Sequence, residues 1–116
     1  MYWMALSLTL LVAVLHVYFL VLEMFLWTHP LGMKTFRNSP EKAAATRVLA
    51  ANQGLYNGFL AAGIGVGLAL HQPTLVTFSL VCVVVAGVYG ALSVSRKIFF
   101  VQAMPALLAL LAWWAV

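Results

Sequence analysis

Uninterrupted apolar segments of membrane-spanning length constrain this chain more than any other feature of its sequence. The first runs from Tyr2 to Trp27 with Glu23 as its one charged residue, and about 20 such residues suffice to cross the hydrocarbon core of a bilayer. Of the 116 residues, 66% are hydrophobic and only 7% are charged, whereas roughly a quarter of the residues in a soluble domain are charged. The sequence therefore predicts an integral membrane protein.

Turn residues divide the chain into four predicted helices within a single domain, residues 1–116. Ser39 can cap the second helix, Pro40 suits its first position, and Glu41 favours the positive end of the helix dipole. The proline and glycine of segment 28–39 are expected to end the first helix in a loop. We predict an all-α fold, a four-transmembrane-helix bundle with helices at about residues 2–27, 40–70, 75–94 and 98–116.

The lysine and arginine residues indicate how the chain is oriented in the membrane. The lipid-embedded part of the second predicted helix is expected to begin near residue 48. The basic residues lie before that point and between the third and fourth helices: Lys34, Arg37, Lys42, Arg47, Arg96 and Lys97. Because short loops rich in lysine and arginine stay in the cytoplasm, both termini are predicted to be extracytoplasmic. This topology, together with anionic lipid in the bilayer, explains the net charge of +4. Nucleic acid is therefore not an expected partner.

Polar residues inside the predicted helices form the candidate site. An ionisable group in a membrane is a functional-site candidate, because burying it costs free energy. His16 and Glu23 are two turns apart on one stripe of the first helix, and Gln53 and Asn57 are one turn apart on the second. The polar residues share the cytoplasmic half of the membrane, and the apolar outer half is expected to be closed. A ligand-binding pocket open to the cytoplasm is predicted from His16, Glu23, Asn52, Gln53, Tyr56, Asn57, Tyr89 and Gln102.

Most of these residues also have a purely structural interpretation. Membrane-buried Asn and Gln often serve only as hydrogen-bond partners between helices, which explains Asn52 and Gln102 as readily as ligand binding does. Tyr56 and Tyr89 fit packing residues with a satisfied hydroxyl better than ligand contacts. Glu23 is harder to explain structurally, since a glutamine would form the same hydrogen bonds without the charge. No dense His, Cys, Asp or Glu spacing is present, so neither a metal site nor a cofactor is predicted.

Small residues predict close helix packing. Gly54 and Gly58 lie one turn apart on the second predicted helix, and Gly87 and Gly90 lie on the third. Because small residues let helix backbones approach, the second and third helices are expected to cross closely or to form a dimer contact. Four short helices rich in small residues would leave the pocket open to lipid unless another surface covers it, so we predict a homodimer. Pro105 is expected to loosen the fourth helix.

Four short elements of the sequence resemble a known family. They are His16 with Glu23 and Trp27, the run Asn-Gln-Gly-Leu-Tyr-Asn-Gly at 52–58, the run Ala-Gly-Val-Tyr-Gly-Ala at 86–91, and Gln102 followed by Pro105-Ala106. In these elements, and over nearly its whole length, the chain resembles a bacterial family of small integral membrane proteins, the domain of unknown function 1304. The resemblance implies a four-helix, multi-pass protein of the bacterial inner (cytoplasmic) membrane. It implies no particular activity.

Three function classes are compatible with these patterns. The favoured class is a membrane protein that binds or transports a small molecule, with Glu23 and His16 exchanging protons with the substrate. The second is a membrane-embedded enzyme that uses the same two residues as acid and base on a lipophilic substrate. The third is a non-catalytic structural or partner-binding subunit, whose polar residues only hold helices together.

Overall fold

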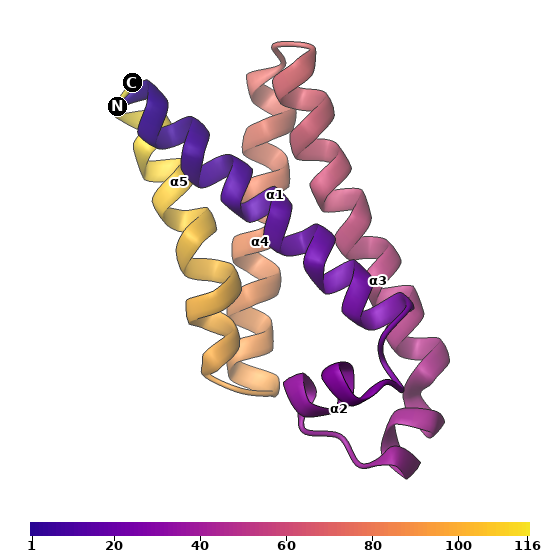
Figure 1. Cartoon of the computed structure of the whole chain (residues 1–116). Helices are drawn as coiled ribbons and strands as arrows, with labels where there is room; N and C mark the ends of the chain where they lie inside the picture. The colour runs from indigo at the N-terminus through magenta and orange to yellow at the C-terminus, as the bar shows by residue number, and fades with distance from the viewer. The chain divides into compact units, whose positions relative to one another are not determined.

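The computed structural model describes all 116 residues, and every regular element in it is a helix. In chain order these are α1 (Tyr2–Met24), α2 (Pro30–Phe36), α3 (Pro40–Ala69), α4 (Pro73–Ser93), the π-helical segment η1 (Phe99–Ala103) and α5 (Met104–Trp114) (Figure 1). The predicted all-α fold is confirmed. Two helices, α1 and α4, are long and apolar enough to cross a membrane by length and composition.

The connection after α1 differs from the sequence-based expectation. Helix α1 ends at Met24, before the predicted end near residue 27, and segment 28–39 contains the short helix α2 as well as loops. Pro30 explains the presence of α2, because a proline at the first helical position loses no hydrogen bond and already has a helical φ. Arg37 then ends α2 in the left-handed conformation, with a φ of 56°.

The fourth predicted helix is divided into a π-helical turn and an α-helix. The backbone N–H of Met104 donates to the carbonyl of Phe99, five residues earlier, as the π pattern requires. Pro105 explains the wider turn, because it has no N–H and its ring would clash with the carbonyl four residues before it. The expected loosening by Pro105 is therefore confirmed. The helical stretch, Phe99–Trp114, is shorter than the predicted range 98–116.

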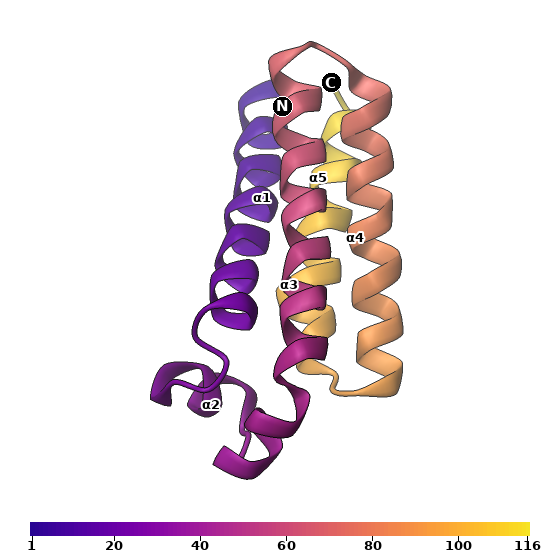
Figure 2. The ribbon, with the colours of Figure 1, turned by 90° about the vertical axis from the view of Figure 1, so that its right-hand side faces the viewer.

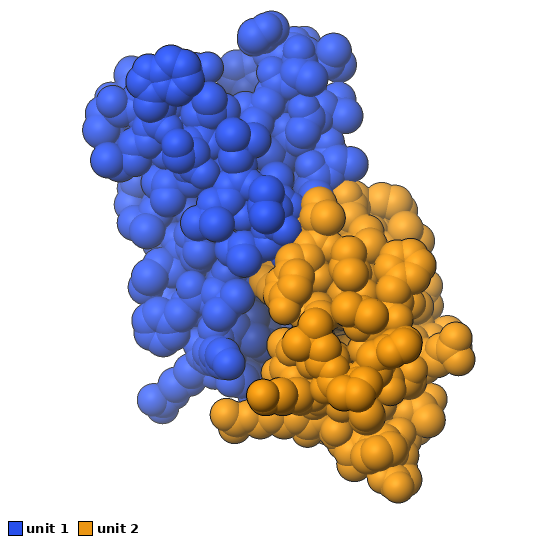
Figure 3. Space-filling model, viewed as in Figure 1, with its two compact units in different colours: residues 1–15, 60–116 blue, residues 16–59 orange.

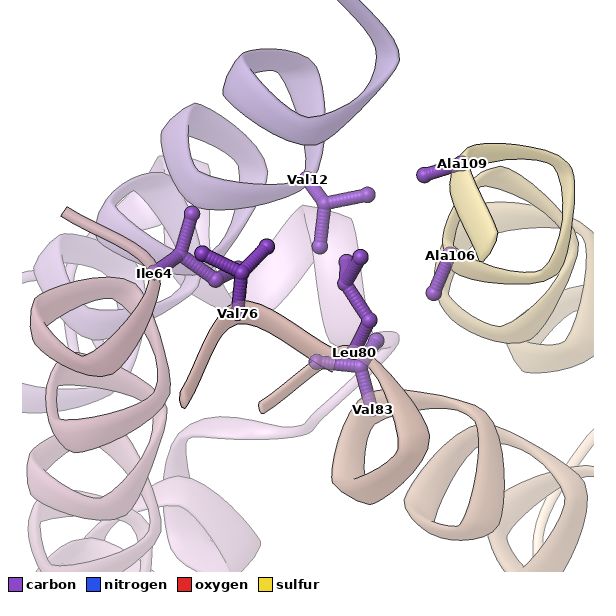
Figure 4. Close-up of a cluster of buried hydrophobic side chains, with 7 residues drawn as sticks. All are labelled: Val12, Ile64, Val76, Leu80, Val83, Ala106 and Ala109. Carbon is purple, nitrogen blue, oxygen red and sulfur yellow. The ribbon is translucent and has the colours of Figure 1, made fainter. Parts of the chain in front are cut away.

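Packing divides the chain into two compact units (Figure 3). Unit 1 comprises residues 1–15 and 60–116, and unit 2 comprises residues 16–59. In unit 1 both chain ends lie at the same end as the turn between α3 and α4, and the turn after α4 lies at the other end (Figures 1 and 2). The core of unit 1 contains side chains from α1, α3, α4 and α5: Val12, Ile64, Val76, Leu80, Val83, Ala106 and Ala109 (Figure 4).

Glycines allow the helices of unit 1 to approach closely. A Cβ at Gly87 would lie 2.6 Å from the backbone nitrogen of Ala103, so α4 and η1 are packed backbone to backbone there. Gly87 therefore contacts the fourth predicted helix rather than the second. The expected close contact between α3 and α4 is made instead at Gly63, where a Cβ would lie 2.5 Å from the hydroxyl oxygen of Ser79.

Replacing Gly87 by alanine is expected to lower the stability of the protein by about 1–3 kcal/mol, the usual cost of overpacking. The atoms that the new methyl group meets include the backbone of Ala103, which cannot rotate away. Gly65→Ala is the matched control, because a Cβ there meets nothing within 4 Å and alanine favours a helix by up to about 1 kcal/mol over glycine. Thermal unfolding in detergent measures both variants, and equal melting temperatures would contradict the backbone contact.

Candidate functional site

The candidate site lies in unit 2, around the carboxylate of Glu23 near the end of α1. Glu23 is only 2% exposed, and two amide side chains of α3 reach it. Gln53 Nε2 donates to Glu23 Oε2 over 2.6 Å, and Asn57 Nδ2 donates to Glu23 Oε1 over 2.5 Å. Each of the two carboxylate oxygens thus accepts a hydrogen bond from a different amide side chain.

Helix geometry and two glycines bring these groups together. Gln53 and Asn57 are four residues apart, so their side chains lie one above the other on α3. Gly54 and Gly58 follow them in the sequence, and both touch α1: a Cβ at Gly54 would lie 2.7 Å from Cγ of Met24, and one at Gly58 would lie close to Leu20. The glycines let α3 approach α1 closely enough for the amides to reach Glu23.

The two amides satisfy the carboxylate without neutralising it. An ionised carboxylate only accepts hydrogen bonds, so both amides must present their N–H groups to it. Hydrogen bonds to a charged group contribute about 1.5–3 kcal/mol each. The protein has only one other acidic residue, Glu41, which is exposed in the first turn of α3. Glu23 is therefore the one carboxyl group enclosed by the fold, and it can take up a proton or attract a cation.

The other predicted site residues of unit 2 are placed differently. His16 lies two turns before Glu23 on α1 and is only 1% exposed, with its ring packed edge-on against Phe19 at a centroid distance of 5.3 Å. Tyr56 is 64% exposed, and Asn52 is also exposed. Exposure alone does not exclude a residue from the group, since Gln53 is exposed as well. Glu23 accepts hydrogen bonds from Gln53 and Asn57, whereas neither Asn52 nor Tyr56 donates to it.

Tyr89 and Gln102 belong to unit 1. Tyr89 is 73% exposed on α4, which suits neither a buried packing residue nor the wall of an enclosed pocket within that unit. Gln102 is partly buried in the π-helical segment η1, beside the turn that Pro105 widens. That these two residues share a pocket with Glu23 stays a prediction.

An interaction that sequence reasoning missed holds the segment after α1 against α3. Trp27 Nε1 donates to the hydroxyl oxygen of Thr46 over 3.1 Å, and that hydroxyl donates to the carbonyl of Lys42 over 2.8 Å. Phe36 of α2 packs against the Trp27 ring at a centroid distance of 4.9 Å. In the sequence Trp27 appeared only as the end of the first apolar segment and as part of the family resemblance, and a tryptophan just beyond a helix end is the one signal that pointed to this contact.

Comparison with known proteins identifies the family. The profile of a family described as protein of unknown function (DUF1304) matches residues 10–114. The chain belongs to the DUF1304 family. The matched range contains Glu23, Gln53 and Asn57, so the hydrogen-bonded group lies inside the DUF1304 region. The resemblance noted in the sequence is confirmed.

A similar protein comes from Lactococcus lactis subsp. lactis (strain IL1403) and is described as uncharacterized protein YpaA. It is 29% identical over 109 residues, which cover 90% of this chain and 92% of the relative. The similarity therefore extends over both units of the DUF1304 chain. No solved structure matches the chain.

Removing one donor from the Glu23 carboxylate is expected to destabilise unit 2. Asn57→Leu should lower stability by about 1–3 kcal/mol, because a buried charge loses a hydrogen bond. The Glu23→Leu/Asn57→Leu double variant should recover much of that loss, since an apolar pair leaves no unpaired charge. Asn52→Leu is the control, because Asn52 is exposed on the same helix and lies outside the group. The free energy of unfolding in detergent is measured for the single variants and the double variant. If the double variant lost as much stability as the two single variants together, the hydrogen bond between Asn57 and Glu23 would be contradicted.

Proposed function

We propose that this protein crosses the bacterial inner membrane four times and binds or transports a small molecule through Glu23. The observation that carries the proposal is the enclosed carboxylate, whose two hydrogen-bond donors are uncharged amides. A structural role needs only hydrogen bonds, which a glutamine could provide without the cost of burying charge. A carboxylate in this position is suited to binding a proton or a cationic group.

The four-span arrangement is supported by the lengths and composition of the helices. Helices α1 and α4 are long and apolar enough to cross a membrane, and Phe99–Trp114 is a shorter apolar helix. Helix α3 is 30 residues long, and its glycines and amides make it less hydropathic than α1 and α4. An even number of crossings fits the position of both chain ends at one end of unit 1, opposite the turn with Arg96 and Lys97 (Figures 1 and 2). That basic turn is expected in the cytoplasm.

The amides give the site two hydrogen-bonding states. When Glu23 is ionised, Gln53 and Asn57 donate N–H groups to it. When Glu23 is protonated, its O–H becomes a donor, and one amide can rotate to present its carbonyl oxygen instead. A cationic substrate can likewise take the place of the proton at the carboxylate. Exchange of a proton for a substrate that carries a positive charge or a hydrogen-bond donor is the chemistry that this arrangement supports best.

Loss of a bound small molecule in a Glu23→Gln variant is the expected result if the carboxylate binds substrate. Native mass spectrometry of the protein purified from cells would detect the adduct. Glutamine can form both hydrogen bonds after one amide rotates, so the variant is expected to fold normally and to lose only the charge. Glu41→Gln removes the other carboxylate and should keep the adduct.

The alternatives give different outcomes in the same experiment. No adduct in the wild-type protein would contradict the proposal and favour a structural subunit. Chemical conversion of the adduct by the wild-type protein and not by Glu23→Gln would instead identify a membrane-embedded enzyme. Equal adducts in the wild type and in Glu23→Gln would place the binding site elsewhere.

The proposed topology predicts which positions are accessible from outside the cell. Introduced into a Cys82→Ala background, which has no other cysteine, a cysteine at position 71 should react with a membrane-impermeant maleimide in intact cells. A cysteine at position 37 should react only after the membrane is permeabilised, because the basic segment faces the cytoplasm. Labelling of position 37 in intact cells would overturn the topology.

A further inference from the structure

A cavity of about 610 Å³ lies in unit 1, and all of its lining residues belong to that unit. It opens at the end where both chain ends and the α3–α4 turn are found (Figures 1 and 2). Its volume lies within the range of small-molecule sites, roughly 300–1,000 Å³. The apolar outer half of the predicted bundle was expected to be closed, whereas the structure has a cavity at this end of unit 1.

Apolar and aromatic side chains form most of the cavity wall. Leu6 from α1, Val76 from α4 and Leu110 from α5 line it together with the rings of Tyr2 and Trp113. The Tyr2 and Trp113 rings meet edge to face, with centroids 5.7 Å apart. This wall favours an apolar body of aliphatic or aromatic character.

A pair of hydrogen bonds through Thr9 fixes the orientation of the Trp113 ring. Its Nε1–H donates to the hydroxyl oxygen of Thr9 over 2.7 Å, and the Thr9 hydroxyl donates to the carbonyl of Ala5 over 2.8 Å. Thr9 is 0% exposed. The polar atom of Trp113 is thus already satisfied, so the residue presents only its ring to the cavity. A fixed wall loses little conformational entropy on binding.

The polar part of the lining lies at the α3–α4 turn. His71 and Gln72 of the turn line the cavity together with Thr77 of α4, and no lysine, arginine, aspartate or glutamate does so. A charged ligand group would find no opposite charge here, whereas a neutral hydroxyl, carbonyl or amide would find donors and acceptors. The lining therefore fits a neutral molecule with one apolar and one hydrogen-bonding part.

His71 occupies a backbone conformation that usually takes glycine. Its φ is 53°. Two backbone hydrogen bonds end α3 here: Gln72 N–H donates to the Gly67 carbonyl over 2.8 Å, and His71 N–H donates to the Leu68 carbonyl over 3.3 Å. Helices that end in this pattern most often have glycine, or sometimes asparagine, at the left-handed position. The helix end therefore does not require an imidazole, which leaves this side chain for the cavity.

We propose that this cavity binds a neutral amphipathic small molecule. Its apolar body lies against Tyr2, Leu6 and Trp113, and its hydrogen-bonding group contacts His71 and Gln72. The proposal is independent of the Glu23 site, because none of the residues that bind Glu23 lines the cavity.

Photolabelling of the full-length protein in detergent with a diazirine-bearing decanol tests this proposal. Labels should be saturable and should concentrate on the peptides that contain residues 2–6 and 110–114. Unlabelled decanol and 2-naphthol, added as separate competitors, distinguish an aliphatic body from an aromatic one. Competition by either supports the proposal, and unsaturable labelling spread over the apolar surface overturns it.

Two pairs of variants localise the site. Thr77→Trp should fill the cavity and lower labelling by about ten-fold, equivalent to about 1.4 kcal/mol of binding free energy. Thr74→Trp adds the same side chain one turn away, at an exposed position outside the lining, and should leave labelling unchanged.

His71→Asn keeps the left-handed helix end and should weaken labelling, whereas His71→Gly should weaken labelling while raising the melting temperature. Equal labelling of the two tryptophan variants would overturn the site.

Discussion

Enclosing the carboxylate of Glu23 requires α1 and α3 to lie close together in unit 2. The carboxylate needs hydrogen-bond donors where water is excluded, and the amides of Gln53 and Asn57 can reach it only across a short interhelical distance. Gly54 and Gly58 provide that distance, since a side chain at either position would collide with α1. The polar group and the small residues beside it are therefore parts of one arrangement, and a change to either disturbs the other.

In unit 1, small side chains allow the last helical segment to pack closely. The buried alanines of the last helical segment recur every third residue, at Ala103, Ala106, Ala109 and Ala112. Small side chains at these positions let the helix backbones approach, and the many van der Waals contacts formed there stabilise the packing. The π-helical turn before Pro105 ends at Ala103, the residue that meets Gly87. The turn thus lets a proline-containing helix keep a backbone contact with α4.

The two units carry sites of opposite chemistry. The Glu23 group accepts hydrogen bonds and can hold a positive charge, so its proposed partners are a proton or a cationic group. The cavity of unit 1 has a fixed aromatic wall and an uncharged polar rim at His71 and Gln72, so its proposed ligand is neutral.

The sequence by itself determined the features that depend on local spacing and composition. Apolar runs predicted an all-α chain, and the four-residue interval between Gln53 and Asn57 placed both on one stripe of a helix, because the period of an α-helix is a local property. The free-energy cost of burying an unpaired charge in an apolar segment identified Glu23 as a candidate site residue. Tertiary structure alone decided which neighbours those stripes meet. It joined Gln53 and Asn57 to Glu23, left Tyr56 exposed, and formed a cavity from residues as distant in sequence as Tyr2 and Trp113. Such contacts depend on how whole helices pack, which the spacing of residues within any single segment does not encode.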